Sequence, residues 1–264
     1  MSEPFPDRLT WLGHSTVLLE LSGMRLLTDP VLRSRIAHLV RIAQPVDRSA
    51  LTPLDAVLIS HFHRDHFDLP SLRSLSRDTH LVVPAGAGTL AAELDFRIVT
   101  ELTPGDELRI GSVTVTAVPA LHDGRREPLG PSAGAIGYLV SGRSGVYFAG
   151  DTDLFDGMAH FRPLLDVALL PVWGWGPSLG QGHLDPDTAA RALALLCPRI
   201  AVPVHWGTLF PMGLSRLRPK ALKEPPLVFK ENAARVAPDV DVRVLAPGEA
   251  TIIDRASLSP RRSV

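Results

Sequence analysis

Three histidines and a carboxylate crowd the six positions from His61 to His66, which also include His63 and Asp65. They directly follow the apolar run 55–60, which has the composition of a buried strand. Loops at the strand ends of layered α/β proteins collect functional groups, because the sheet holds them rigidly while leaving them exposed. The sequence therefore predicts a site at the end of a central strand.

The spacing inside this stretch predicts two metal positions rather than one. In an extended turn, His61 and His63 point the same way because side chains alternate with a period of two. Asp65 and His66 are adjacent, so they point toward a second position. Neutral imidazoles are the usual ligands of zinc and similar divalent ions, and a carboxylate adds negative charge. The alternative is a solvated loop whose histidines are satisfied by hydrogen bonds.

Three more side chains of metal-ligand type stand directly after predicted strands: His122, Asp151 and His205. Four separate strands therefore deliver an imidazole or a carboxylate at the same kind of position, which core packing does not explain. Asp151 follows the apolar segment 145–149, and a carboxylate buried there is costly unless it is paired or bound to metal. We expect all three residues to join the site.

The rest of the chain alternates short strands and helices, separated by turn and breaker residues, as in a layered α/β fold. Segment 31–53 and the Pro-rich stretch 211–226 are expected to be irregular. The expected strands are 8–12, 16–21, 24–28, 55–60, 80–84, 97–99, 107–110, 112–118, 135–140, 145–149, 166–171, 200–204, 241–245 and 250–253. The expected helices are 69–75, 85–94, 154–161, 185–196 and 229–237.

Length and composition favour one soluble enzyme domain spanning 1–264. The chain has 264 residues, of which 45% are hydrophobic and 21% charged, and this suits a globular enzyme. The formal net charge is −1, from 27 basic and 28 acidic residues, and no amphipathic membrane-docking helix is visible. We therefore expect a small-molecule substrate, no nucleic-acid partner and no stable membrane association. The sequence does not decide between a monomer and a homo-oligomer.

The beginning of the chain and its one cysteine indicate in which cellular compartment the protein is expected. The first residues show no basic and apolar leader, and no apolar run approaches the roughly 20 residues that span a bilayer. A cytoplasmic protein is therefore expected. Cys197 is the only cysteine, which excludes an intrachain disulfide and a cysteine-based metal site. Its apolar neighbours predict that it is a small core residue.

The pattern of candidate ligands is similar to that of a known family. Segment 61–66, followed by His122, Asp151 after Gly150, and His205, resembles the metallo-β-lactamase superfamily of binuclear metallohydrolases. The resemblance runs from about residue 9 to about residue 210 of this sequence. Three further segments resemble the branch that holds N-acyl-phosphatidylethanolamine phospholipase D and the L-ascorbate-6-phosphate lactonases: 11–16, 27–30 and 205–208.

The resemblance implies a four-layer αββα sandwich, the metallo-β-lactamase fold, of mixed α/β class, with two divalent metal ions. Zinc is the expected metal, with manganese or iron as alternatives. Three histidines would hold one ion, a carboxylate and two histidines would hold the other, and one aspartate would bridge both. In that order, the implied ligands are His61, His63 and His122; Asp65, His66 and His205; and Asp151.

Such a centre implies a hydrolytic mechanism. Two divalent ions ~3.5–4 Å apart lower the pKa of a bridging water and supply hydroxide near neutral pH. The predicted function is a binuclear metal-dependent hydrolase that uses this hydroxide to cleave a phosphodiester or ester bond of a small soluble substrate. A lactonase of the L-ascorbate-6-phosphate lactonase type is the alternative, followed by a nuclease or a non-catalytic metal-binding sensor. The expected catalytic residues are Asp65, Asp151 and His183.

Three residues outside the ligand set are candidates for supporting roles. His183 stands just before the helix cap at Asp185, and in the phospholipase D-like branch a histidine here lies close to the metals. It is expected to bind substrate or to donate a proton to the leaving group; the alternative is a histidine that serves the helix N-terminus. His14 and Asp29 are expected to orient ligand imidazoles, with simple turn roles as the alternative.

Four residues are candidates for substrate contacts. Arg125 and its neighbour Arg126, close after His122, could clamp a phosphate or a carboxylate; the alternative is a pair of solvated loop arginines. Trp173 and Trp175 could wall an apolar pocket above the metals. Core packing of their loop is the alternative for the two tryptophans.

Overall fold

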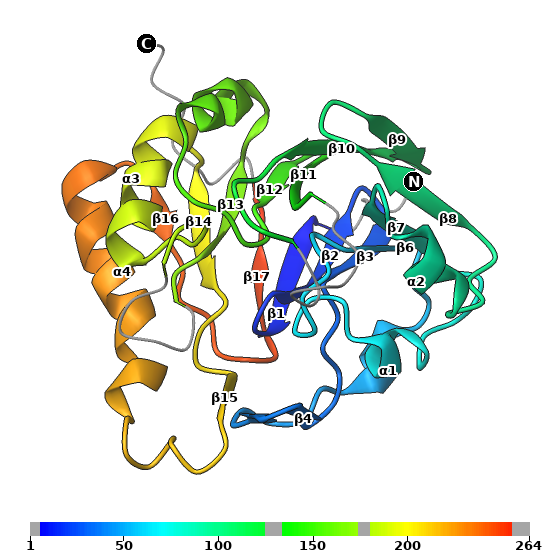
Figure 1. Ribbon diagram of the computed structural model, residues 1–264. Coiled ribbons are helices and arrows are strands. Elements are labelled where there is room, and N and C mark those ends of the chain that lie inside the picture. The colour runs from blue at the N-terminus through cyan, green and yellow to red at the C-terminus, as the bar shows by residue number, and fades with distance from the viewer. Residues whose placement is uncertain (1–5, 125–133, 174–179, 255–264) are drawn as a thin grey trace.

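Two large β-sheets face each other at the centre of the protein (Figure 1). The structure is a computed structural model that describes residues 6–124, 134–173 and 180–254. Among these residues each sheet has seven strands. The first sheet runs in the spatial order β17 (Glu249–Ile252), β1 (Arg8–Gly13), β2 (Thr16–Leu21), β3 (Met24–Thr28), β6 (Ala56–Leu58), β7 (His80–Pro84) and β8 (Val99–Leu102). The second runs β16 (Asp241–Val242), β14 (Ile200–Val204), β13 (Val167–Pro171), β12 (Gly145–Phe148), β11 (Ile136–Ser141), β10 (Val113–Pro119) and β9 (Glu107–Ile110).

Each sheet joins an antiparallel part to a parallel part. In the first sheet, strands β17, β1, β2 and β3 pair antiparallel, whereas β3, β6, β7 and β8 pair parallel. In the second sheet, β9 to β12 pair antiparallel, whereas β12, β13, β14 and β16 pair parallel. The carboxyl ends of parallel strands share one edge of a sheet, where functional groups collect. The candidate site lies at these ends.

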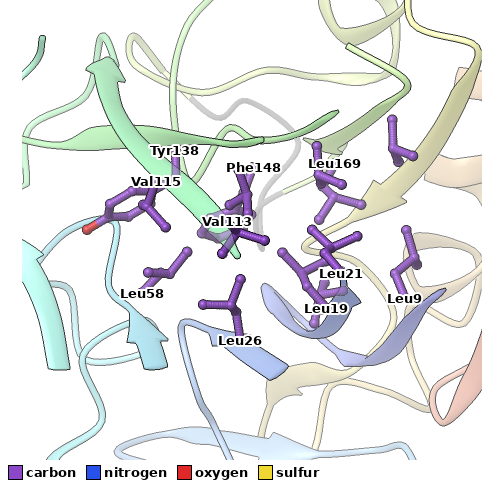
Figure 2. Close-up of a cluster of buried hydrophobic side chains, with 14 of the residues drawn as sticks. Leu9, Leu19, Leu21, Leu26, Leu58, Val113, Val115, Tyr138, Phe148 and Leu169 are labelled. Carbon is purple, nitrogen blue, oxygen red and sulfur yellow. The ribbon is translucent and has the colours of Figure 1, made fainter. Parts of the chain in front are cut away.

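The main hydrophobic core lies between the two sheets (Figure 2). Leu19 and Leu58 reach it from the first sheet, and Tyr138 and Phe148 reach it from the second. The Tyr138 hydroxyl also donates a hydrogen bond of 2.7 Å to the carbonyl oxygen of Ile59, just ahead of the histidine loop. Apolar burial therefore holds the two sheets together, and a hydrogen bond between them fixes their alignment next to the site.

Helices cover the outer faces of both sheets and complete the four-layer αββα sandwich, which confirms the predicted fold class. Strand β2 shows why four layers form: Val17 and Leu19 enter the core between the sheets, whereas Leu18 packs in the outer cluster under α1 and α2. Both faces of the sheet are thus apolar. The helices are α1 (Leu69–Leu72) and α2 (Gly88–Ala92) on the first sheet, α3 (Pro186–Leu196), α4 (Glu224–Val236) and the 3₁₀ helix η2 (Asp156–Leu164) on the second, and the short 3₁₀ helices η1 (Arg48–Leu51) and η3 (Lys220–Leu222).

A small third sheet lies where we predicted irregular chain. Within the described residues it consists of β4 (Arg35–Ile36), β5 (Leu39–Arg41) and β15 (Leu209–Pro211), in the order β15-β5-β4. Strands this short show no periodicity, and β15 pairs with a segment far away in the sequence, so the local pattern could not reveal them. The prediction of irregular structure was therefore wrong at β4 and β5, within segment 31–53, whereas β15 lies almost entirely outside the segments predicted to be irregular.

Three local expectations also need correction. Helix α4 begins at Glu224 rather than 229, because Pro225 and Pro226 occupy its first turn, where no amide hydrogen is needed. The segment expected as helix 154–161 is the 3₁₀ helix η2. Cys197 is exposed at the end of α3 in a left-handed conformation, φ 44°, so it is not a core residue. None of the described helices combines the length and the hydropathy that a bilayer crossing requires.

Candidate metal centre

Strand ends from both sheets bring the seven predicted ligand side chains to one place. His61 and its neighbours follow β6, Asp151 follows β12 and His205 follows β14. Two compact groups form among them, with ligand atoms within 4.8 Å of one another. Their roles as metal ligands stay a prediction, but the positions required for those roles are present. The first group is His61, His63 and His122, and the second is Asp65, His66 and His205 together with His14.

The first group is a set of three imidazoles whose nitrogens face each other. His61 Nε2 lies 3.0 Å from His63 Nδ1, and His122 Nε2 lies 3.1 Å from the same His63 atom. The rings meet edge to face, with interplanar angles of 82° between His61 and His63 and 89° between His63 and His122. Three nitrogens on differently inclined rings therefore converge on one point.

The second group combines two imidazoles with a carboxylate. His66 Nε2 lies 3.2 Å from His205 Nε2. Asp65 Oδ2 lies 3.7 Å from His66 Nε2 and 3.8 Å from His205 Nε2. His14 contacts this group from behind, with its Nε2 3.0 Å from Asp65 Oδ2. This group therefore carries a negative charge that the first group lacks.

Asp151 lies between the two groups. Its Oδ2 is 3.4 Å from both His66 Nε2 and His205 Nε2 and 4.0 Å from His61 Nε2. Its other oxygen, Oδ1, is buried and has no hydrogen-bond partner among the described residues. A buried carboxylate oxygen without a partner is costly unless a cation occupies the space beside it. This orphaned oxygen is the first sign that the pocket suits a metal.

Backbone carbonyls orient two of the histidines. His122 Nδ1 lies 2.8 Å from the carbonyl oxygen of Gly182, and His205 Nδ1 lies 2.5 Å from that of Trp173. A carbonyl oxygen only accepts hydrogen bonds, so each Nδ1 must carry the proton. In the neutral ring the lone pair is then on Nε2, which is the atom that faces the cluster.

One carboxylate, that of Asp29, orients two more histidines. His66 Nδ1 lies 2.6 Å from Asp29 Oδ2. The Ser60 hydroxyl donates to the same oxygen over 2.6 Å, and its own oxygen is 2.9 Å from His61 Nδ1. Since that hydroxyl has already used its hydrogen, it accepts one from His61. Both rings therefore also turn an Nε2 lone pair toward the cluster.

The geometry of the nitrogens fits a metal. In the neutral rings, the Nε2 atoms of His66 and His205 are both without a proton at a separation of 3.2 Å. Two lone pairs this close repel each other unless a cation lies between them, either a metal ion or a proton on one of the two nitrogens. Imidazole nitrogens with carboxylate oxygens are the donor set of zinc and of similar first-row divalent ions. The residues present therefore fit the implied metal ions.

The electrostatics of the site favour the metal-binding form at neutral pH for the first ligand group and for Asp151, but not for His66 and His205. Burial lowers the pKa of His61 well below its usual range and that of His122 to about 4, so both are neutral. Burial raises the pKa of Asp151, but His205 and His66 outweigh it and hold that pKa well below its usual range. Burial lowers the pKa of His66, yet the carboxylates around it, Asp151 first, bring it above the ordinary value. His61 and His122 thus offer neutral nitrogens beside the ionised Asp151. The carboxylates instead raise the pKa of both His66 and His205 and favour their protonated forms, whose protons a bound metal ion would displace.

The backbone at the site is held in a conformation that few residues adopt. His14, Asp29 and His205 have φ angles of 53°, 31° and 64°. The amide of His205 donates to the carbonyl oxygen of His14 over 3.0 Å, so two of these turns are joined. Left-handed non-glycine residues cluster at functional sites, where the surrounding structure holds them in place.

Close approach of the two sheets at the site requires a glycine at position 150. Gly150 has φ +61°, and a Cβ placed there would lie 2.5 Å from Ser60 Cβ. The contact joins the loop after β12 to the loop after β6. A side chain at this position would push Asp151 away from the histidine loop.

The structure also places the remaining predicted residues. His183 Nε2 lies 3.9 Å from Asp151 Oδ2, and the His183 side chain is 30% exposed. His14 and Asp29 contact Asp65 and His66, as an orienting role requires. Trp173 stacks on Phe210 with ring centroids 5.6 Å apart. The other predicted substrate contacts, Arg125, Arg126 and Trp175, lie outside the described residues.

Several contributors to the site were missed by sequence analysis. Ser60 stands directly before His61, and a hydroxyl at a strand end next to a candidate ligand was a usable signal. The carbonyl oxygens of Gly182 and Trp173 are backbone atoms, and every residue has one, so no sequence pattern could single them out. Gly150 was visible only as part of the Gly-Asp pair.

The fold and the two clusters define a metal-dependent hydrolase of the metallo-β-lactamase fold. Residues 24–206 match the family model of the beta-lactamase superfamily domain. The chain belongs to that superfamily.

Relatives of known sequence agree with this assignment. A UPF0173 metal-dependent hydrolase from Methanopyrus kandleri is 32% identical over 249 residues, which cover 92% of this chain and 98% of the relative. An uncharacterized protein from Mycobacterium tuberculosis is 33% identical over 259 residues, covering 91% of this chain and 67% of the relative. The match with the archaeal hydrolase extends over nearly the full length of both chains.

Solved structures show the same fold. Igni18, a metallo hydrolase from the archaeon Ignicoccus hospitalis, superposes with a TM-score of 0.71 at 24% identity, covering 94% of this chain and 98% of that one. An isothiocyanate hydrolase from Delia radicum gut bacteria superposes with a TM-score of 0.70 at 19% identity, covering 92% and 98%. At these identities the likeness establishes the fold alone.

Proposed function

We propose that the chain is a binuclear metal-dependent hydrolase that cleaves a phosphodiester bond, or a related ester bond, of a small substrate. One observation carries the proposal: Asp151 lies between two separate groups of ligand side chains, within 4.0 Å of a histidine from each. A single metal would need only one of the groups. Two groups joined by one carboxylate suit two ions that share it.

Each ion has its own set of side chains. His61, His63 and His122 would hold the first, and Asp65, His66 and His205 the second, with Asp151 shared. Zinc suits a set dominated by imidazoles, and manganese or iron can occupy the same donors where they are more available. When bound, such ions supply Lewis-acid activation of water and of the substrate's phosphoryl or carbonyl oxygen.

The chain's own residues supply orientation. Asp29 fixes the ring of His66 directly and that of His61 through Ser60. The carbonyl oxygens of Gly182 and Trp173 fix His122 and His205. Ligands locked in this way need no rearrangement as substrate reacts, which is the condition for electrostatic stabilisation of a transition state.

His183 is the candidate proton donor. It is partly exposed beside Asp151, and its Nε2 is 3.9 Å from Asp151 Oδ2. It belongs to neither of the two ligand groups assigned above, although it forms a further cluster with His122 and Asp151, and its partly exposed ring can contact substrate. We assign to Nε2 of His183 the transfer of a proton to the oxygen of the leaving group.

Two sequence motifs that favour the phospholipase D and lactonase branch meet in the structure. The ring of Trp11 stacks on that of Trp206, with centroids 4.9 Å apart. The Thr208 hydroxyl accepts a hydrogen bond of 2.9 Å from the amide of His14. Segments 11–16 and 205–208 thus form one unit behind the second ligand group, and this supports a place in that branch.

Metal content and turnover together test the proposal. The protein is purified without added metal, its metals are counted per chain, and hydrolysis of bis(p-nitrophenyl) phosphate and of a simple lactone is measured. Two metals per chain with diester turnover support the proposal. Two metals with turnover of the lactone alone would make the protein a lactonase. Protein that holds no metal, even after reconstitution, would contradict the binuclear centre and with it the mechanism.

A further inference from the structure

A strongly basic surface lies beside the metal centre, and apart from His205 at the start of one of its segments it has no role in the proposed hydrolysis. It is built from segments 31–46 and 205–223, which we call the basic surface. The two segments lie side by side because β15 pairs with β5, Leu209 opposite Arg41 and Phe210 opposite Val40. In Figure 1, β15 and β4 lie together at the lower end of the molecule, below both large sheets.

The charge of this surface differs sharply from that of the whole chain. The chain has 27 basic and 28 acidic residues, yet the two segments contain no aspartate or glutamate. Their charge is therefore entirely positive, although the formal net charge of the protein is −1. The basic residues are Arg33, Arg35, Arg41, Arg216, Arg218, Lys220 and Lys223.

Several of these cations are unpaired. Arg33 is bound to Asp68 over 2.7 Å, and Lys220 lies 3.8 Å from Glu224. Arg216, Arg218 and Lys223 are exposed, and in the part of the chain that the structure describes they form no ion pair. Their charges are available to an anionic partner.

Exposed apolar side chains are interleaved with the cations. Met212 is 59% exposed, Leu214 41% and Leu217 75%. The amides of Leu217 and Arg218 both donate to the carbonyl oxygen of Leu214, each over 3.0 Å, so the segment closes into a turn. In sequence, Leu217 stands between Arg216 and Arg218. Large apolar side chains this exposed, gathered in one place, mark an interaction site.

We propose that the basic surface docks on an anionic lipid bilayer. Apolar side chains set among Lys and Arg suit the boundary of a membrane. The apolar side chains enter the acyl region, and the Lys and Arg side chains stay at the phosphate head groups. We expected no stable membrane association from the net charge of the chain. A net charge is a sum over all residues, so it does not reveal a local basic surface. The proposal does not depend on which bond the enzyme cleaves.

Two other occupants fit less well. A second copy of the chain in a symmetric contact would place the same cations against one another, which costs electrostatic energy. A single-stranded nucleic acid needs exposed aromatic rings for base stacking. The aromatic residues of these segments are instead packed inward: Phe210 is buried against Trp173, and Trp206 stacks on Trp11.

Vesicle flotation of the full chain tests the proposal. Wild-type protein is mixed with vesicles of phosphatidylcholine alone, or of phosphatidylcholine with about one third phosphatidylglycerol, at low and high salt. The test variants are Leu217→Glu and the double substitution Arg216→Ser with Arg218→Ser. Ile98→Glu is the matched control, because Ile98 is a 52% exposed apolar residue beside Arg97, away from this surface.

We expect wild type and Ile98→Glu to float with the anionic vesicles, with about tenfold weaker binding for both test variants and release at high salt. Leu217 is exposed, so thermal unfolding and metal content should not change. Absence of binding, or equal binding of all variants, would overturn the proposal. Concentration-dependent dimers that Leu217→Glu abolishes would assign the surface to a second copy. Salt-sensitive binding to an RNA oligonucleotide that Leu217→Glu leaves intact would assign it to nucleic acid.

Discussion

Asp29 Oδ2 accepts hydrogen bonds from two groups, His66 Nδ1 at 2.6 Å and the Ser60 hydroxyl at 2.6 Å. Through Ser60 the same carboxylate also sets the ring of His61. His61 is assigned to one proposed metal and His66 to the other. One buried side chain therefore positions a ligand in each group.

We expect Asp29→Asn to weaken metal binding by about 10–100-fold, because the amide no longer enforces the Nδ1–H form of His66. The measurement is a competition titration with a zinc chelator. Asp166→Asn is the control, since Asp166 is equally buried but accepts a hydrogen bond from the amide of Gly145, the first residue of β12, at the opposite end of that strand from Asp151. Unchanged zinc affinity in Asp29→Asn would contradict the orienting role.

Asp151→Ala should reduce the metal content from two ions per chain to one or none and lower turnover by about 10³-fold or more. The reason is the position of Asp151 Oδ2 within 3.4 Å of His66 and His205 and within 4.0 Å of His61. Elemental analysis and steady-state kinetics on one preparation provide both numbers. A variant that keeps two metals and full activity shows that Asp151 bridges nothing.

His183→Ala should retain the metals but lose about 10²–10⁴-fold in kcat on a substrate with an alkyl leaving group. The loss should be much smaller with p-nitrophenolate, which leaves without a proton. His160→Ala, which alters an exposed histidine of η2 that belongs to neither ligand group, is the control. Equal losses on both substrates, or loss of metal, would mean that His183 binds or ligates rather than donates a proton.

Acid should destabilise the metal-free protein through His14. Burial lowers the His14 pKa to about 3, below its ordinary value of 6.5. The unfolded chain therefore binds a proton between these values that the folded chain excludes, and stability falls as the pH drops below 6.5. The slope is about 1.4 kcal/mol per pH unit for this one group. Urea unfolding of chelator-treated protein between pH 5 and pH 7 should show a slope that is shallower by about this amount in His14→Asn; identical slopes would contradict the assignment.

Gly150→Ala should cost about 2 kcal/mol or more in the free energy of unfolding. Two effects add: a φ of +61° and a Cβ only 2.5 Å from Ser60 Cβ. Gly23→Ala separates them, because Gly23 has φ +84° with open space around it and therefore reports conformational strain alone. Equal costs for the two variants would mean that the loops after β6 and β12 give way easily.

The candidate ligands were predictable where metal-binding side chains directly follow apolar strands. The run of apolar residues before His61 predicted the strand, and the same pattern located Asp151 and His205. The structure places His61 Nε2 and His205 Nε2 each within 4.0 Å of Asp151 Oδ2. The four-layer fold was predictable because family resemblance and alternating apolar strands agree.

Long-range pairing and backbone contacts could not be predicted in this way. Strand β15 has three residues and pairs with β5, which lies over 160 positions earlier in the chain, so local periodicity carries no trace of it. The basic surface is likewise created by that pairing. Segment 31–53 is visibly rich in arginine, but the sequence does not show that residues 205–223 lie beside it, and the net charge of the chain conceals their sum.

The two ways of orienting the histidines have different evolutionary consequences. His122 and His205 are aligned by the carbonyl oxygens of Gly182 and Trp173, which no substitution of a side chain can delete. His66 depends on Asp29, which a single base change in a codon can replace. The orientation of His122 and His205 is therefore robust to point mutation, whereas the orientation of His66 can be changed by one substitution. Divergence among enzymes of this type should therefore alter the partner of His66 and leave the alignment of His122 and His205 unchanged.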